Sequence, residues 1–125
     1  MIPFLQELYK QFTSVHSESY LERNSSSTVT YPYLTYDFDS EPIELHTDGF
    51  YIDVDIFDDS GNYLKIFNIE SKLKDHFKRN RVMTDDVYIR FNFLRSVKIP
   101  TGDDIIKRRN LQFYCKVDWR KKEWV

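Results

Sequence analysis

Hydrophobic and polar residues alternate with a period of two along residues 49–57, and the period then changes to that of a helix. In the segment GFYIDVDIF, the apolar positions share one side of a strand and the acidic positions share the other. The next residues, DDSGN, are typical of a tight turn in which Ser60 or Asn62 caps a helix. We therefore predict a central strand, a turn and an amphipathic helix that ends near residue 77. Its apolar stripe consists of Ile66, Ile69, Leu73 and Phe77.

A second helix is predicted over residues 2–15, where Pro3 suits a first helical turn. Its apolar face consists of Phe4, Leu5, Leu8, Phe12 and Val15. Residues 16–27 lose this periodicity and include a run of serines, which indicates a surface loop. Both helices are expected to pack on one side of a sheet.

Three further strands are predicted, over residues 28–38, 87–94 and 111–119. The first is dense in β-branched and aromatic residues, and its Pro32 belongs at an edge, a strand start or a bulge. Polar residues 39–48 should form a loop, and residues 95–110 an excursion from the sheet. The order is helix, strand, strand, helix, strand, strand. This order predicts an α+β fold, with a mainly antiparallel sheet of roughly four strands, in a single domain over residues 1–125.

The composition supports a folded domain, because 41% of the 125 residues are hydrophobic and 17% are aromatic. We expect no signal peptide and no membrane span, since no run of about 18 apolar residues occurs. The net charge of -2 is unevenly distributed. Acidic residues concentrate over residues 37–59, whereas residues 107–109 and 120–122 are basic. Such patches suit head-to-tail packing of identical subunits, although ordinary solvated charge is the alternative.

The sequence favours no enzyme and no cofactor. His16, His46 and His76 stand apart, without the spaced Cys and His partners of a zinc site. A nuclease would use Asp53 or Asp55 with Glu70 and Lys72, but the predicted helix places Glu70 and Lys72 about 200° apart. Nucleophile motifs and phosphate-binding loops are absent from the sequence. The single cysteine, Cys115, alternates with apolar residues and is expected to be a buried structural thiol.

Aromatic residues exceed what one core needs. The tyrosines in this surplus are Tyr31, Tyr33, Tyr36, Tyr51, Tyr88 and Tyr114. Of these, Tyr88 and Tyr114 could form an RNA-binding sheet face with Arg90, but Asp53, Asp55 and Asp118 should crowd that face and repel phosphates. Because tyrosine is enriched at protein interfaces, the sequence favours an assembly protein over a nucleic-acid-binding module.

Several segments in their order resemble the tail-terminator proteins of long-tailed bacteriophages, also called tail-completion or tail-to-head joining proteins. After an N-terminal helix come PYLTY at residues 32–36, FYIDVDIFD at 50–58, the DDSGN turn with its helix, and IIKRRNLQFY at 105–114. The resemblance implies a non-catalytic subunit of a hexameric ring that caps the finished tail tube, stops its growth and faces the head. It also implies as partners other copies, the major tail tube protein and a head-completion or connector protein. The location it implies is the virion, after synthesis in the host cytoplasm.

Within this hypothesis, subunits of the ring are predicted to meet through two charged regions. The acidic region is Asp53, Asp55, Asp58 and Asp59, and the basic region is Lys107, Arg108 and Arg109. Two loops are predicted to contact the tube, the connector or a neighbouring subunit, through Glu41, Glu44, His46 and Asp48, and through Lys98, Asp103 and Asp104. Reversing the three basic charges should abolish assembly and leave the subunit folded. The alternatives are another head-completion or minor tail protein, or a sheet-based nucleic-acid-binding module.

Overall fold

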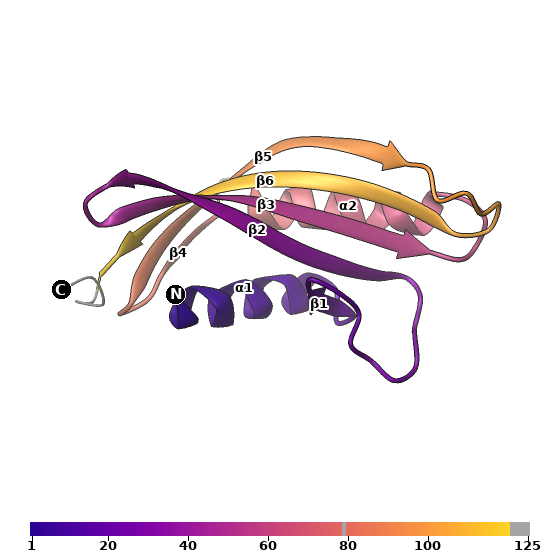
Figure 1. Ribbon diagram of the computed structural model, residues 1–125, viewed down its shortest axis with the longest axis horizontal. Coiled ribbons are helices and arrows are strands. Elements are labelled where there is room, and N and C mark those ends of the chain that lie inside the picture. The colour runs from indigo at the N-terminus through magenta and orange to yellow at the C-terminus, as the bar shows by residue number, and fades with distance from the viewer. Residues whose placement is uncertain (79, 121–125) are drawn as a thin grey trace.

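The computed structural model describes residues 1–78 and 80–120, which form one curled six-stranded sheet and two helices (Figure 1). The helices are α1 (Ile2–Val15) and α2 (Leu64–Phe77). The strands are β1 (Ser19–Leu21), β2 (Tyr33–Glu44), β3 (Thr47–Asp58), β4 (Arg81–Met83), β5 (Val87–Ile99) and β6 (Lys107–Trp119). The α+β class and the positions of both predicted helices are confirmed.

The sheet is built from two long hairpins, β2–β3 and β5–β6, which pair through β3 and β6 at its centre. The strand order is β1-β2-β3-β6-β5-β4, and every neighbouring pair is antiparallel except β1 with β2. The prediction of roughly four strands missed β1 and β4. Each of these is three residues long, which is too short for a period of two to be recognised.

Two predicted loops are largely strand. Residues 39–48 continue β2 and begin β3, and only Leu45 and His46 form the turn between them. Residues 95–99 continue β5 and residues 107–110 begin β6, so that the loop between these strands is residues 100–106. Residues 39–41 and 107–110 carry polar side chains on both faces of the sheet, which removes the alternation that the prediction relied on. Pro32 directly precedes β2, as expected of a proline at a strand start.

Both helices pack on one face of the sheet, and they meet each other there. The Phe4 ring of α1 stacks on Phe50 of β3 at a centroid distance of 4.2 Å. The Phe77 ring of α2 lies 5.1 Å from Phe12 and 5.3 Å from Phe113. Each fully buried side chain of this size contributes about 1.5–3 kcal/mol to folding. The predicted apolar stripe of α2 is buried in this core, and so is Cys115, where burial raises the pKa of the thiol to about 12.

A β-bulge changes which residues of β5 face the helices. Up to Phe93, which pairs with Phe113, the odd-numbered residues face the core. The register then shifts between Phe93 and Arg95, so that Ser96 pairs with Leu111 on the helix side. Arg95, which pairs with Gln112, lies on the face that no helix covers. In the part of the chain that the structure describes, neither helix has the length and apolar content needed to cross a membrane.

Candidate assembly interface

The acidic and basic regions that were predicted to join neighbouring subunits lie side by side within one chain. They occupy β3 and β6, which pair along their whole length. On the uncovered face, Arg108 Nε donates to Asp55 Oδ1 at 3.1 Å, and Asn110 Nδ2 donates to the same oxygen at 3.2 Å. Gln112 Nε2 donates to Asp53 Oδ1 at 3.0 Å. The expectation of two separate, opposed patches is therefore corrected, whereas a role of these residues between subunits stays a prediction.

Arg109 lies on the opposite face of the sheet, in a network below α2. Its Nε donates to Glu70 Oε1, and its Nη2 donates to Ser96 Oγ at 2.8 Å. Lys74 Nζ lies 2.8 Å from Glu70 Oε2, and the Arg109 guanidinium lies 5.2 Å from the Phe67 ring centroid. Burial alone would raise the pKa of the Glu70 carboxyl, but the hydrogen bonds and charges of Arg109 and Lys74 lower this pKa below its ordinary value.

Glu70 is 6% exposed, and the sequence analysis did not identify it as a buried residue. The signal was present, because Glu70 stands four residues after Ile66 and three before Leu73, on the apolar stripe of α2. Among the described residues, the cations beside Glu70 are Arg109 and Lys74. Reversing the charge of Arg109 would place two buried carboxylates together. The expectation that such a variant stays folded is therefore corrected.

The acidic residues at the end of β3 have different surroundings. Asp58 is fully buried and accepts a hydrogen bond from Ser60 Oγ, whereas Asp59 is exposed. Asp58 therefore cannot contact a neighbouring subunit in this conformation. The nuclease arrangement is also not formed, since Asp53 and Asp55 lie on the uncovered face and Glu70 lies on the helix-covered face.

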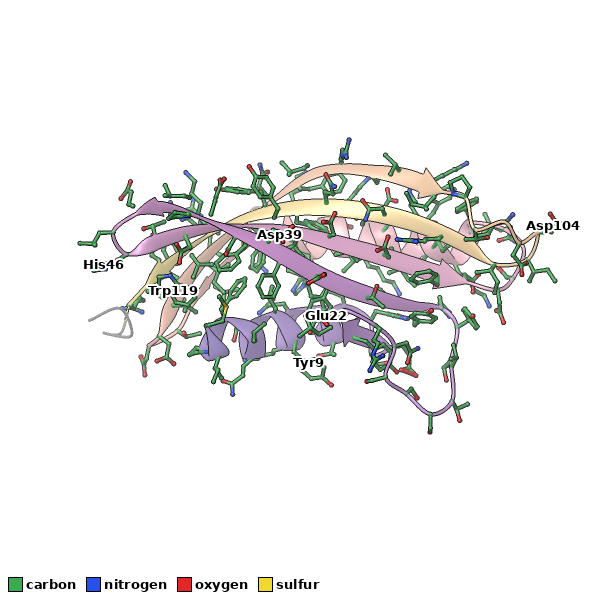
Figure 2. The ribbon with its side chains drawn as sticks, in the orientation of Figure 1. Tyr9, Glu22, Asp39, His46, Asp104 and Trp119 are labelled. Carbon is green, nitrogen blue, oxygen red and sulfur yellow. The ribbon has the colours of Figure 1, made fainter. Side chains whose placement is uncertain are left out.

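The two predicted contact loops lie at opposite ends of the sheet, where His46 and Asp104 are labelled (Figure 2). At the β2–β3 turn, Asp48 Oδ2 accepts from Trp119 Nε1 at 2.8 Å, and Glu41 Oε1 accepts from Tyr114 Oη at 3.2 Å. Leu45, between Glu44 and His46, is 86% exposed.

The β5–β6 loop is organised by Asp103, whose Oδ1 accepts from the N–H groups of Ile105 and Ile106 at 2.7 and 3.1 Å. These two backbone donors lower the pKa of the Asp103 carboxyl. Asp104 is exposed, and Lys98 Nζ lies 4.8 Å from the Tyr63 ring centroid. The predicted basic residues Lys121 and Lys122 lie outside the described residues.

The uncovered face carries both tyrosines and carboxylates. Tyr51 and Tyr114 are paired across β3 and β6 with ring centroids 4.8 Å apart. Arg90 Nη2 donates to Asp118 Oδ2 at 3.2 Å. The arginine that an RNA-binding face would use to contact phosphate is therefore paired with a carboxylate. Tyr36 does not belong to this surplus. It is 2% exposed in the core, where it stacks on Phe12 and burial raises its pKa to about 12.

Each long outer strand is only half covered by its short neighbour. β1 pairs with β2 as far as Tyr36, whose carbonyl accepts from the N–H of Glu22, and no other strand of the described residues pairs with the outer edge of residues 37–44. β4 pairs with β5 as far as Arg90, and Phe91 N–H donates to the Asn80 carbonyl, so that within residues 1–78 and 80–120 the outer edge of residues 92–99 is open. The β2 edge carries Asp37, Asp39, Glu41 and Glu44, and the β5 edge carries Arg95 and Lys98. These open edges could not be predicted while both segments were read as loops.

Comparison with solved structures finds a likeness in fold. A chain of the structure titled "Virion of native gene transfer agent (GTA) particle" superposes with a TM-score of 0.62. The two sequences are 13% identical, and the match covers 89% of this chain and 91% of that chain. No protein-family model and no curated protein matches the sequence. A chain of that virion therefore has a similar fold.

Proposed function

We propose that the protein is a structural component of a phage-like virion and has no catalytic role. The observation that carries the proposal is the likeness to a chain of a gene transfer agent virion over nearly the full length of both chains. The resemblance of the sequence to tail-terminator proteins supports the same class independently of that superposition. The absence of a catalytic role is supported by the charged side chains Asp53, Asp55, Arg90 and Arg108 of the uncovered face, because they bond to other side chains across the sheet.

We further propose that copies of the chain form a ring on the end of the tail tube, where the ring stops elongation and offers a surface for the head. The positions of two exposed loops support a role between two different partners. The β2–β3 turn and the β5–β6 loop lie at opposite ends of the sheet (Figure 1). Each exposes an aliphatic side chain beside a carboxylate, Leu45 beside Glu44 in the first and Ile105 beside Asp104 in the second. One end would face the major tail tube protein and the other the head-completion or connector protein.

The test is electron microscopy of particles made after deletion of this gene from the genome that carries it. Overlong tails lying apart from filled heads are expected, because nothing would then stop the tube or join it. Expression of the intact gene from a plasmid should restore joined particles of normal tail length. Normal, joined virions after deletion would contradict the terminator role. Absence of the protein from purified wild-type particles, checked by mass spectrometry, would contradict the virion assignment itself.

A further inference from the structure

We infer that neighbouring copies join edge to edge, with residues 37–41 of β2 in one copy paired to residues 95–99 of β5 in the next. This inference rests on the proposed ring and names its contact. Strand addition at an open edge uses main-chain hydrogen bonds that both edges present without rearrangement of the core. The two edges belong to opposite sides of the same sheet, so the contact is head-to-tail and can close into a ring.

The open segments match in length and are delimited by the short strands. Each comprises eight residues, 37–44 in β2 and 92–99 in β5. When residue 37 is placed opposite residue 99 of the neighbour, β5 ends where β1 begins to cover β2, and Pro100 directs the chain away. At the other end, β2 turns at Leu45 before it would reach the neighbour's β4. The two short strands therefore frame the contact without overlapping it.

Strand direction and side-chain facing are also compatible. β2 and β5 run in opposite directions in the sheet, so copies that share one orientation in a ring place these edges antiparallel. Beyond the bulge, Arg95 and Val97 lie on the uncovered face, as do Asp39 and Glu41 of β2. The proposed register places Glu41 opposite Arg95 and Asp39 opposite Val97, which keeps the uncovered faces of both copies continuous.

The register requires a stagger of four residues between copies, because within one sheet Arg95 is level with Asp37 rather than with Glu41. Four residues correspond to about 13 Å along the strands, and the four long strands of a copy to about 19 Å across them. A closed ring built with this offset has strands inclined by about 35° to its axis, which is within the range of closed β-barrels. The stagger of four residues is therefore of the size that a closed ring of tilted strands requires.

Charge selects the partner edge. Carboxylates line the β2 edge, so that two β2 edges would repel each other, whereas Arg95, on the same uncovered face of β5, attracts them. The backbone N–H and C=O groups of even-numbered β2 residues point to the outer edge of β2. Leu34 N–H shows this, because it donates to the Glu18 carbonyl on the β1 side. Pro42 has no N–H to offer, so the ladder ends before it and covers residues 37–41. Phe38 N–H donates to the side chain of Asp37 at 2.8 Å, and Asp37 must release it when the ladder forms.

Such a contact is small, and a single one falls below the area of a stable binary interface. Closure compensates, because each copy in a ring is held by two contacts at high effective concentration. Dilute subunits are therefore expected to be monomeric, and the contact forms at high concentration or on the end of a tail tube.

The test is disulfide cross-linking of paired cysteine substitutions, in concentrated purified protein and in purified particles. Asp39→Cys with Val97→Cys should give a ladder of covalent oligomers under oxidising, non-reducing conditions, because these positions are directly opposite in the proposed register. Asp39→Cys with Asn92→Cys is the matched control, since those positions are level only in an unstaggered contact. The native Cys115 is fully buried and should not contribute.

A second variant tests the role of charge. In the cross-linking background, Arg95→Glu should slow ladder formation at least about fivefold, because it opposes the neighbour's Glu41. Adding Glu41→Arg should restore the rate, whereas Arg81→Glu, on exposed β4 outside the contact, should leave it unchanged. Unchanged circular dichroism would establish that each variant is folded.

Absence of the 39/97 ladder in both samples would overturn the inference, and so would a ladder from the 39/92 pair. The proposed function is tested separately, by whether mass spectrometry finds the protein in the particles. If it is present in particles that give no ladder, the edge contact is wrong and the virion role stands. If it is absent from particles but purified protein forms the ladder, the contact stands and the virion role is wrong.

Discussion

At the scale of single residues, the Glu70–Arg109 pair shows how a charge can belong to the core. Glu70 lies on the apolar stripe of α2 and accepts a hydrogen bond from Arg109 Nε, while Ser96 Oγ accepts one from Nη2 of the same guanidinium. The cost of burying both ions is offset because their hydrogen-bonding groups are engaged. The pair therefore fixes the position of α2 above β5 and β6 more than it adds net stability.

Glu70→Gln is expected to lower the free energy of unfolding by about 2–3 kcal/mol at neutral pH, because Arg109 then lacks a buried counter-charge. Since the folded-state pKa of Glu70 lies below its ordinary value, the stability from its ionised form is present above that value and is lost as the pH falls through the folded-state pKa. Urea denaturation across acidic pH should show the wild type approaching the variant. A difference that is independent of pH would contradict the ion pair. Lys74→Met, which removes a cation that is 40% exposed, should cost about 0.5 kcal/mol.

Gly49 is a second residue whose identity is set by a neighbour. A Cβ at this position would lie 2.1 Å from Tyr114 Oη, so Tyr114 must move if Gly49 becomes alanine. We expect Gly49→Ala to cost about 1–3 kcal/mol in the free energy of unfolding, through overpacking and loss of the Tyr51–Tyr114 contact. In a Tyr114→Ala background the same substitution should cost much less. Equal costs in both backgrounds, measured by a double-mutant cycle, would show that Tyr114 is not the cause.

At the scale of elements, α2 has one face in the core and another beside the β5–β6 hairpin. Phe77 is 1% exposed and contacts rings from α1, β5 and β6, whereas Phe67 of the same helix is 40% exposed. Phe77→Ala should therefore lower the free energy of unfolding by about 3–5 kcal/mol. Phe67→Ala is the matched control and should cost about 1 kcal/mol, because it loses mainly the stacking with Tyr63 and Arg109. Similar costs for the two variants, by urea denaturation, would mean that α2 is rotated from the described position.

The elements also show where the sequence was sufficient and where it was not. Alternation along residues 50–56 and helical spacing from Ile66 to Phe77 predicted β3 and α2 correctly, because burial on one face enforces each pattern. The pattern fails where a strand leaves the core. Val97 and Ile99 continue the odd-numbered apolar series of β5, yet the bulge turns them to the uncovered face. The open edges were missed for the same reason, since edge pairing depends on contacts distant in sequence.

At the scale of the whole molecule, the distribution of charge discriminates between the proposed assembly role and the nucleic-acid-binding alternative. Carboxylates of β2 and β3 share the uncovered face with Tyr51 and Tyr114, and Arg90 and Arg108 are each paired with a carboxylate. This face should repel a phosphate backbone. We expect no retention of the protein on single-stranded DNA or RNA columns at about 50 mM salt. Retention that falls steeply as salt rises would favour the nucleic-acid-binding alternative.

The same carboxylates would acquire a second role in a closed ring. Because α1 and α2 cover one face of the sheet, that face must lie on the outside, and the uncovered face would line the channel. A channel lined by carboxylates would let a polyanion pass without binding it. Substituting Asp53 by lysine should leave ring cross-links intact and slow genome ejection from particles, measured by dye uptake of released DNA. Unchanged ejection in particles that carry the variant would contradict this orientation of the sheet.

The bulge in β5 has a consequence for chain length. The extra residue, Leu94, is 45% exposed, and its neighbours Phe93 and Arg95 pair with the consecutive residues Phe113 and Gln112. Removing Leu94 would leave a regular ladder in which every remaining side chain of β5 keeps its face. Removing a single residue from the bulge-free stretch 87–92 would instead exchange core and exposed residues over part of the strand. β5 thus contains one position at which the chain can shorten by a residue without losing its register.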